Sequence, residues 1–143
     1  QVFEVIEPES PYEAWLAEHF SKKERTAGMI TAPLADPDED GLNNTMEFGT
    51  GLDPRNSATM RPAEVLDGVF PGEKLLRFRR RNLPRGVSTM IEKSSDLGEW
   101  LPDRAGDLEI LSVEKTTDWG VEIVTVRVRG ESSFLRLRVT IDD

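Results

Sequence analysis

A short acidic segment in the first half of the chain carries the residues that are best suited to chemistry. From Asp36 to Glu47, side chains with oxygen atoms occupy positions 1, 3, 5, 9 and 12 of a twelve-residue frame, and Gly41 occupies position 6. A loop that winds around a cation turns alternate positions inward, and the glycine permits its sharp turn. Oxygen ligands without nitrogen or sulfur favour calcium over zinc or copper, and magnesium prefers a smaller shell that keeps its waters. The spacing therefore predicts a calcium site.

The predicted ligands are four carboxylates, one backbone carbonyl and one side-chain amide: Asp36, Asp38, Asp40, Glu47, Leu42 and Asn44. Glu47 would bind the ion with both oxygens from a short helix after the loop, and Asn44 would reach it directly or through a water. Carboxylates about 4–5 Å apart repel by a few kcal/mol per close pair, so we expect the loop to open without the ion. The alternative is a solvated acidic turn, because Asp, Asn and Gly are common in turns.

The residues before the loop predict one amphipathic helix. Ser10, Pro11 and Glu13 form a capping-box pattern with proline at the first helical position. The apolar residues that follow at helical spacing form one stripe: Tyr12, Trp15, Leu16 and Phe20. This stripe must pack against another part of the protein.

The second half of the chain predicts strands. Apolar residues alternate with polar ones in residues 75–79, 121–129 and 134–141, and more weakly in residues 89–93 and 108–113. Short strands without helical patterns between them favour an antiparallel sandwich or small barrel. We therefore predict an α+β, mainly β fold: an N-terminal helix, a single EF-hand-like calcium loop with a short helix, and then an antiparallel β-sandwich.

Charge is distributed unevenly along the 143 residues. Residues 1–72 have a net charge of −9, with 14 acidic and 5 basic residues, whereas residues 73–143 have 13 of each. The Gly- and Pro-containing stretch from Asp67 to Gly72 is where we expect the two parts to join. We predict a helical and calcium-loop segment over residues 1–70 and a β-sandwich over residues 71–143. Because the chain begins at Gln1, we expect a fragment or a processed product.

Composition excludes several classes of site. The chain has no cysteine, which excludes disulfides and thiolate chemistry, and its single histidine, His19, makes histidine metal clusters improbable. Four arginines alternate with Leu76 and Phe78, which indicates the solvated face of a strand rather than a nucleic-acid site in a chain of net charge −9: Arg77, Arg79, Arg80 and Arg81. No apolar run reaches the roughly 20 residues that a membrane span needs.

The loop and its surroundings resemble a known group of sequences. Residues 36–54, DPDEDGLNNTMEFGTGLDP, resemble the calcium loops of thrombospondin type 3 repeats and dockerin-like EF-hands, in a form common near the C-termini of large secreted bacterial proteins. Residues 92–100 and 134–139 resemble strands of the fibronectin type III-like β-sandwich that follows in those tails. Two positions depart from the family pattern: Glu39 replaces a usual glycine, and Asn43 replaces an aliphatic residue that bridges paired loops.

The resemblance implies a non-catalytic, calcium-stabilised accessory module of an exported bacterial protein, secreted or at the cell surface, with a structural or surface-attachment role. The alternative is a binding module with a structural calcium, either for a polysaccharide through Trp100 and Trp119 or, like a dockerin, for another surface protein. An enzyme would need a deep pocket and carboxyl groups with displaced pKa values outside residues 36–47. No catalytic motif is present, so we expect that the chain is not an enzyme.

Overall fold

The computed structural model describes residues 10–57, 61–71, 73–102, 108–128 and 134–142. Within these ranges, short helices are followed by strands: α1 (Pro11–His19), α2 (Lys22–Ala27), α3 (Asn44–Thr50), β1 (Ala63–Asp67), β2 (Lys74–Arg81), β3 (Val87–Ser94), β4 (Leu101–Pro102), β5 (Leu108–Lys115), β6 (Val121–Val128) and β7 (Phe134–Ile141). The fold is mainly β with a few short helices, which confirms the predicted class.

The strands form two antiparallel sheets. One sheet has the order β1-β2-β6-β5 and the other has the order β4-β3-β7. Apolar residues from both sheets pack in one cluster, whose buried members are Leu76, Phe78, Ile91, Val124 and Val126. The alternation of apolar and polar residues that predicted β2, β3, β5, β6 and β7 arises because successive side chains of a strand point to opposite faces.

Two helices begin with the same capping motif. Ser10 and Glu13 form a capping box at the start of α1, as predicted. Ser21 and Glu24 form a second one at the start of α2, a helix that was not predicted. In each box, the serine hydroxyl accepts from the third residue of the helix, and the glutamate carboxylate accepts from the serine N–H.

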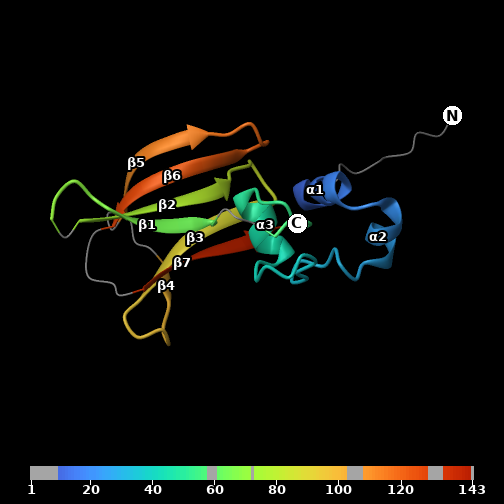
Figure 1. Cartoon of the computed structure of the whole chain (residues 1–143), viewed down its shortest axis with the longest axis horizontal. Helices are drawn as coiled ribbons and strands as arrows, with labels where there is room; N and C mark the ends of the chain where they lie inside the picture. The colour runs from blue at the N-terminus through green and yellow to red at the C-terminus, as the bar shows by residue number, and fades with distance from the viewer. Residues whose placement is uncertain (1–9, 58–60, 72, 103–107, 129–133, 143) are drawn as a thin grey trace.

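The helices gather at one end of the two sheets, with α3 lying between the strands and α1 (Figure 1). The predicted stripe of α1 is buried there in a second apolar cluster, with Phe48 of α3 and Val87 of β3: Tyr12, Trp15, Leu16 and Phe20. Trp119, from the turn between β5 and β6, packs against the same cluster. The helical segment and the ends of the sheets therefore share one core.

Gly49 allows α3 to lie close to β7. A Cβ atom at Gly49 would overlap both γ-methyl groups of Val139. We expect Gly49→Ala to lower the free energy of unfolding by about 1–2 kcal/mol, because the overlap outweighs the better helix propensity of alanine. Urea denaturation measures this difference. Gly98→Ala is the control, because the nearest atom to its added methyl group would lie 3.6 Å away, and a loss of equal size there would contradict the packing argument.

Strand β5 forms one edge of the four-stranded sheet, and its pairing with β6 is irregular. The register shifts between Ile110 and Ser112, which leaves an extra residue, Leu111, on the edge strand. Such a bulge bends a strand and locally disrupts its ladder of hydrogen bonds. The outer edge of β5 is therefore not a regular template for another strand.

Candidate metal centre

The acidic loop is held in shape by its own backbone. The two carboxylate oxygens of Asp36 accept hydrogen bonds from the N–H groups of Asp40, at 3.3 Å, and Gly41, at 2.9 Å. Asp40 Oδ1 accepts from the N–H of Leu42 at 2.8 Å. Gly41 has a φ of 88°, in the left-handed region that glycine enters without steric cost. These contacts wind the chain into a tight loop before α3 begins.

Glu39 also has a left-handed backbone, with a φ of 55°. This conformation is sterically unfavourable for a residue with a Cβ atom, by about 1–2 kcal/mol. A glycine here would avoid this cost, because it has no Cβ atom. The loop of this chain therefore stores backbone strain next to its acidic side chains.

Helix α3 places the last carboxylate of the frame. The side chain of Asn43 caps the helix by accepting from the N–H of Met46 at 2.9 Å. Glu47 follows in the first helical turn, and its relative exposure is 0%. A negative charge in this turn is favoured by the helix dipole, but complete burial without a partner opposes it.

The structure brings together the four carboxylates that the spacing predicted. Asp36, Asp38, Asp40 and Glu47 each offer an oxygen atom, and these atoms all lie within 4.8 Å of one another. Both carboxylate oxygens of Asp38 and both of Glu47 are buried and accept no hydrogen bond from any described residue. Because buried charges are normally paired, hydrogen-bonded or bound to a metal, this arrangement suits a cation with hard oxygen ligands.

Burial and mutual repulsion shift the acidity of this cluster. Burial, followed by the charges of Asp38, Asp40 and Asp36, raises the pKa of Glu47 to about 9. Burial, followed by the neighbouring carboxyl groups of Asp36 and Asp40, raises the pKa of Asp38 to about 6. Both shifts have the direction expected when a carboxylate lacks a compensating positive charge.

In the absence of metal, these shifts predict that stability falls as pH rises. The pKa of Glu47 rises from 4.5 in the unfolded chain to about 9 in the folded protein, so the folded protein binds more protons between these values. The free energy of unfolding in chelator should therefore decrease steadily from about pH 5 to pH 8. Urea denaturation at each pH measures this slope, and Glu47→Gln should reduce it. An equal slope in that variant would contradict the assignment to Glu47.

The two predicted ligands without charge lie in the same segment. The N–H of Leu42 binds Asp40, which holds the Leu42 backbone within the loop. Asn44 is fully buried, and its Nδ2 donates to the carbonyl oxygens of Ile30 and Ala32, at 2.9 Å each. Its Oδ1 is buried and accepts no hydrogen bond from a described residue. The amide thus joins the start of α3 to residues 30–32, a contact that the sequence pattern did not predict.

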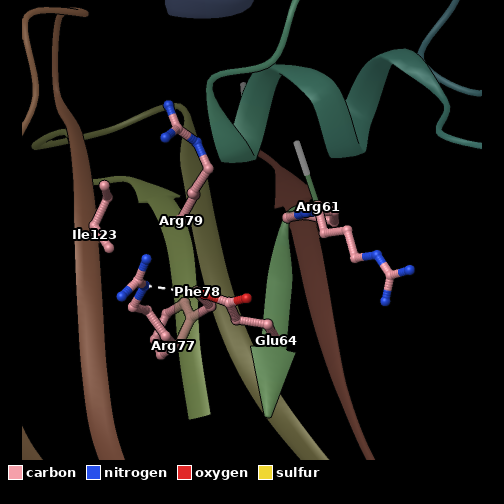
Figure 2. Close-up of a pocket in the computed structure, with 7 residues that line it drawn as sticks. Arg61, Glu64, Arg77, Phe78, Arg79 and Ile123 are labelled. Carbon is pink, nitrogen blue, oxygen red and sulfur yellow. Dashed lines mark ion pairs between the residues drawn. The ribbon is translucent and has the colours of Figure 1, made fainter. Parts of the chain in front are cut away.

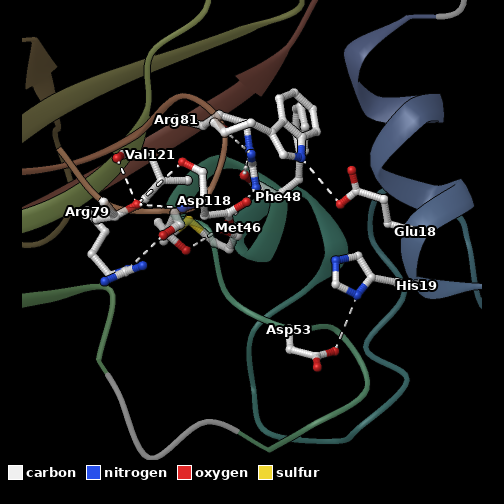
Figure 3. A network of polar contacts seen from close by, with 12 residues as sticks. Glu18, His19, Met46, Phe48, Asp53, Arg79, Arg81, Asp118 and Val121 are labelled. Carbon is white, nitrogen blue, oxygen red and sulfur yellow. Dashed lines mark hydrogen bonds and ion pairs between the residues drawn. The ribbon is translucent and has the colours of Figure 1, made fainter.

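Arg81 connects α3 to the four-stranded sheet. Its guanidinium donates to the carbonyl oxygens of Phe48 at 2.8 Å and Trp119 at 2.5 Å, and lies 3.3 Å from Asp118 Oδ2 (Figure 3). Its carbon Cζ lies 4.3 Å from the ring centroid of Trp119. The side chain of Arg81 is 0% exposed, so the prediction of a solvated arginine face was wrong at this position. The reason is that α3 and the β5–β6 turn cover it.

Two further contacts join α1 to the same region. His19 Nδ1 lies 3.6 Å from Asp53 Oδ1, and Trp119 Nε1 donates to Glu18 at 3.3 Å (Figure 3). They attach the helix to the segment after α3 and to the β5–β6 turn. Helix α1 is therefore fixed by polar contacts as well as by its apolar stripe.

The two tryptophans considered for sugar stacking lie in loops next to different sheets. Trp119 packs against the helical cluster from the β5–β6 turn, whereas Trp100 precedes β4 and stacks with Arg136, whose Cζ is 4.1 Å from its ring centroid. No ring contact joins them among the described residues. Each ring is engaged by its own arginine rather than by the other tryptophan.

None of the described helices has the length and apolar character that crossing a membrane requires. No family model, curated protein or solved structure matches the chain, so the assignment of the acidic centre depends on its own residues and geometry.

Proposed function

We propose that the chain is a non-catalytic, calcium-stabilised accessory module of an exported bacterial protein, with a structural or surface-attachment role. The observation that carries this proposal is Glu47, whose two carboxylate oxygens are buried without a donor beside three other carboxylates. An acidic turn exposed to solvent would hydrate its charges, whereas this one removes the carboxylate oxygens of Asp38 and Glu47 from water. Asp36, Asp38, Asp40 and Glu47 would hold the ion, with Leu42 and Asn44 completing an EF-hand-like shell.

Calcium fits this donor set better than magnesium or zinc. The cluster has four carboxylates, the Leu42 carbonyl and the Asn44 amide belong to the same segment, and calcium accepts six to eight oxygen ligands in a flexible shell. Bound calcium supplies the positive charge that the buried carboxylates lack. In this role the chain's own residues fold the acidic loop, exclude water and orient the carboxylates.

A structural role is favoured by the surroundings of the site. Phe48, which follows Glu47, contributes its ring to the core shared by the helices and the sheets, and its carbonyl oxygen binds Arg81. Closing the loop around an ion would therefore fix α3 against both sheets, which we propose form a β-sandwich like that of fibronectin type III domains. The carboxyl groups of Asp38 and Glu47, whose pKa values are raised, both lie in the acidic loop, where we propose that they bind the ion rather than take part in a reaction.

Isothermal titration calorimetry tests this proposal. Chelator-treated protein titrated with calcium should bind one ion per chain, with an affinity at least tenfold above that for magnesium. Glu47→Gln should abolish the binding, whereas Glu13→Gln, in the capping box of α1 and outside the loop, should leave it unchanged. Absence of calcium binding by the folded wild-type protein would overturn the proposal.

A further inference from the structure

A groove of about 410 Å³ lies on the four-stranded sheet, formed by residues outside the acidic loop. Its lining comes from β1, β2, β6 and the residues just before β1: Arg61, Pro62, Glu64, Arg77, Arg79 and Ile123. Arg77 lies opposite Glu64 in the β1–β2 pair, and Arg79 lies opposite Ile123 in the β2–β6 pair. Because Leu76 and Phe78 point into the apolar cluster, Arg77 and Arg79 lie on the other face of the strand.

The groove is basic, although the chain has a net charge of −9. Its lining residues include three arginines and one acidic residue, Glu64. Arg77 Nε lies 3.2 Å from Glu64 Oε1, whereas no carboxylate among the described residues pairs with Arg61 or Arg79. A local excess of positive charge without internal partners is suited to an anionic ligand.

Arg79 is held in place before any ligand binds. Its Nε donates to the carbonyl oxygen of Thr50, the last residue of α3, at 2.9 Å. This contact uses the Nε–H group of the guanidinium and leaves the two terminal nitrogens for another acceptor. Since the side chain is already ordered, a ligand loses less conformational entropy on binding to it.

The arginines do not converge on one point. Arg77 and Arg79 lie near Ile123, whereas Arg61 extends away from them on the other flank of β1 (Figure 2). A single small oxyanion cannot contact all three guanidinium groups in this arrangement. A chain that carries several anionic groups can bridge them, with the apolar surface of Pro62 and Ile123 beneath it.

The position of the groove on the sheet determines which kind of polymer suits it. Strands β2 and β6 pair with neighbours on both sides and the inner edge of β1 pairs with β2, so the backbone groups between the strands of the groove are committed within the sheet. An extended peptide would lose the backbone pairing that gives most strand ligands their affinity. We propose that this groove binds an acidic polysaccharide, whose carboxylate or sulfate groups pair with Arg77, Arg79 and Arg61. This site goes beyond the proposed calcium role and replaces the tryptophan pair as the polysaccharide surface.

Three probes with one sugar backbone test the proposal: short chains of dextran, carboxymethyl dextran and dextran sulfate, titrated into the whole protein by calorimetry. At least one of the charged chains should bind, the neutral chain should not, and added salt should weaken the binding. The combined change Arg77→Gln and Arg79→Gln should weaken it at least tenfold. Arg138→Gln, which removes the same charge from the three-stranded sheet, should change it less than twofold.

Glu64→Gln gives a result that a purely structural role of the arginines would not predict. It removes the carboxylate that competes for Arg77 and should strengthen binding of the charged chain severalfold. Circular dichroism confirms that each variant is folded, and Arg77→Gln alone serves if the double variant is not, because Arg77 is half exposed.

Several results would overturn the groove proposal. The first is that neither charged chain binds, and the second is that neutral dextran binds as tightly as a charged chain. The third is that Arg138→Gln weakens binding as much as the combined Arg77 and Arg79 change. The fourth is that polyglutamate binds more tightly than the charged dextrans, which would indicate an acidic polypeptide ligand. Titrations run in calcium and in chelator separate the two proposals. If the charged chains bind in neither buffer while the protein binds one calcium ion, the polysaccharide site is rejected and the calcium proposal is unaffected.

Discussion

Millimolar calcium should raise the melting temperature of the protein by about 10 °C relative to the protein in excess chelator. An ion at 100 times its dissociation constant stabilises the folded state by about 2.7 kcal/mol. In a domain of this size, each kcal/mol shifts the melting temperature by about 2–4 °C or somewhat more. Differential scanning calorimetry measures the shift, with magnesium as the comparison ion.

The Glu47→Gln variant should differ from the wild-type protein both in calcium and in chelator. Its melting temperature should not respond to calcium, because the side chain that would bind with two oxygens has lost its charge. In chelator at pH 8, however, the variant should be at least as stable as the wild-type protein. The reason is that the pKa of Glu47 rises to about 9 on folding, so the wild-type protein at pH 8 must take up a proton that its unfolded chain does not bind, whereas glutamine carries no such cost. A variant that stayed responsive to calcium would contradict the assigned ligand.

The second large effect is expected from Arg81→Met, which should lower the free energy of unfolding by about 3–5 kcal/mol. The change leaves the carbonyl oxygens of Phe48 and Trp119 without their donor, and each unsatisfied buried group costs about 1–3 kcal/mol. It also removes the stacking of the guanidinium on the rings of Phe48 and Trp119. Chemical denaturation monitored by tryptophan fluorescence measures the loss.

Arg77→Met is the matched control for this prediction, because it removes an arginine from the same strand. Its partner Glu64 is 46% exposed, and exposed ion pairs contribute at most about 1 kcal/mol. Arg81→Lys should give an intermediate loss, since an ammonium group cannot reach three acceptors in a plane. If Arg81→Met and Arg77→Met were equally mild, α3 would not depend on Arg81 for its attachment.

The acidic loop could be predicted because its information is local. Twelve consecutive residues specify which oxygens turn inward, and the helix that carries Glu47 follows directly. The stripe of α1 was predictable for the same reason, since a helical repeat places its apolar residues on one face.

Contacts between distant segments could not be predicted in this way. The alternation along β2 indicates which face of the strand carries Arg81. It does not indicate that a helix from residues more than 30 positions earlier covers that face. Strand β1 has only a weak apolar pattern, because it lies at a sheet edge with most of its residues exposed. The predicted boundary between residues 70 and 71 falls between β1 and β2, which pair with each other; glycine and proline mark turns within a sheet as well as junctions.

The irregular edge of β5 has a consequence for proteins displayed in many copies on one surface. Crowded neighbours can join when regular sheet edges meet and extend one another into aggregates. The extra residue at Leu111 interrupts the row of backbone groups that an incoming strand would need. The β5 edge of the four-stranded sheet therefore offers crowded copies no regular strand to extend.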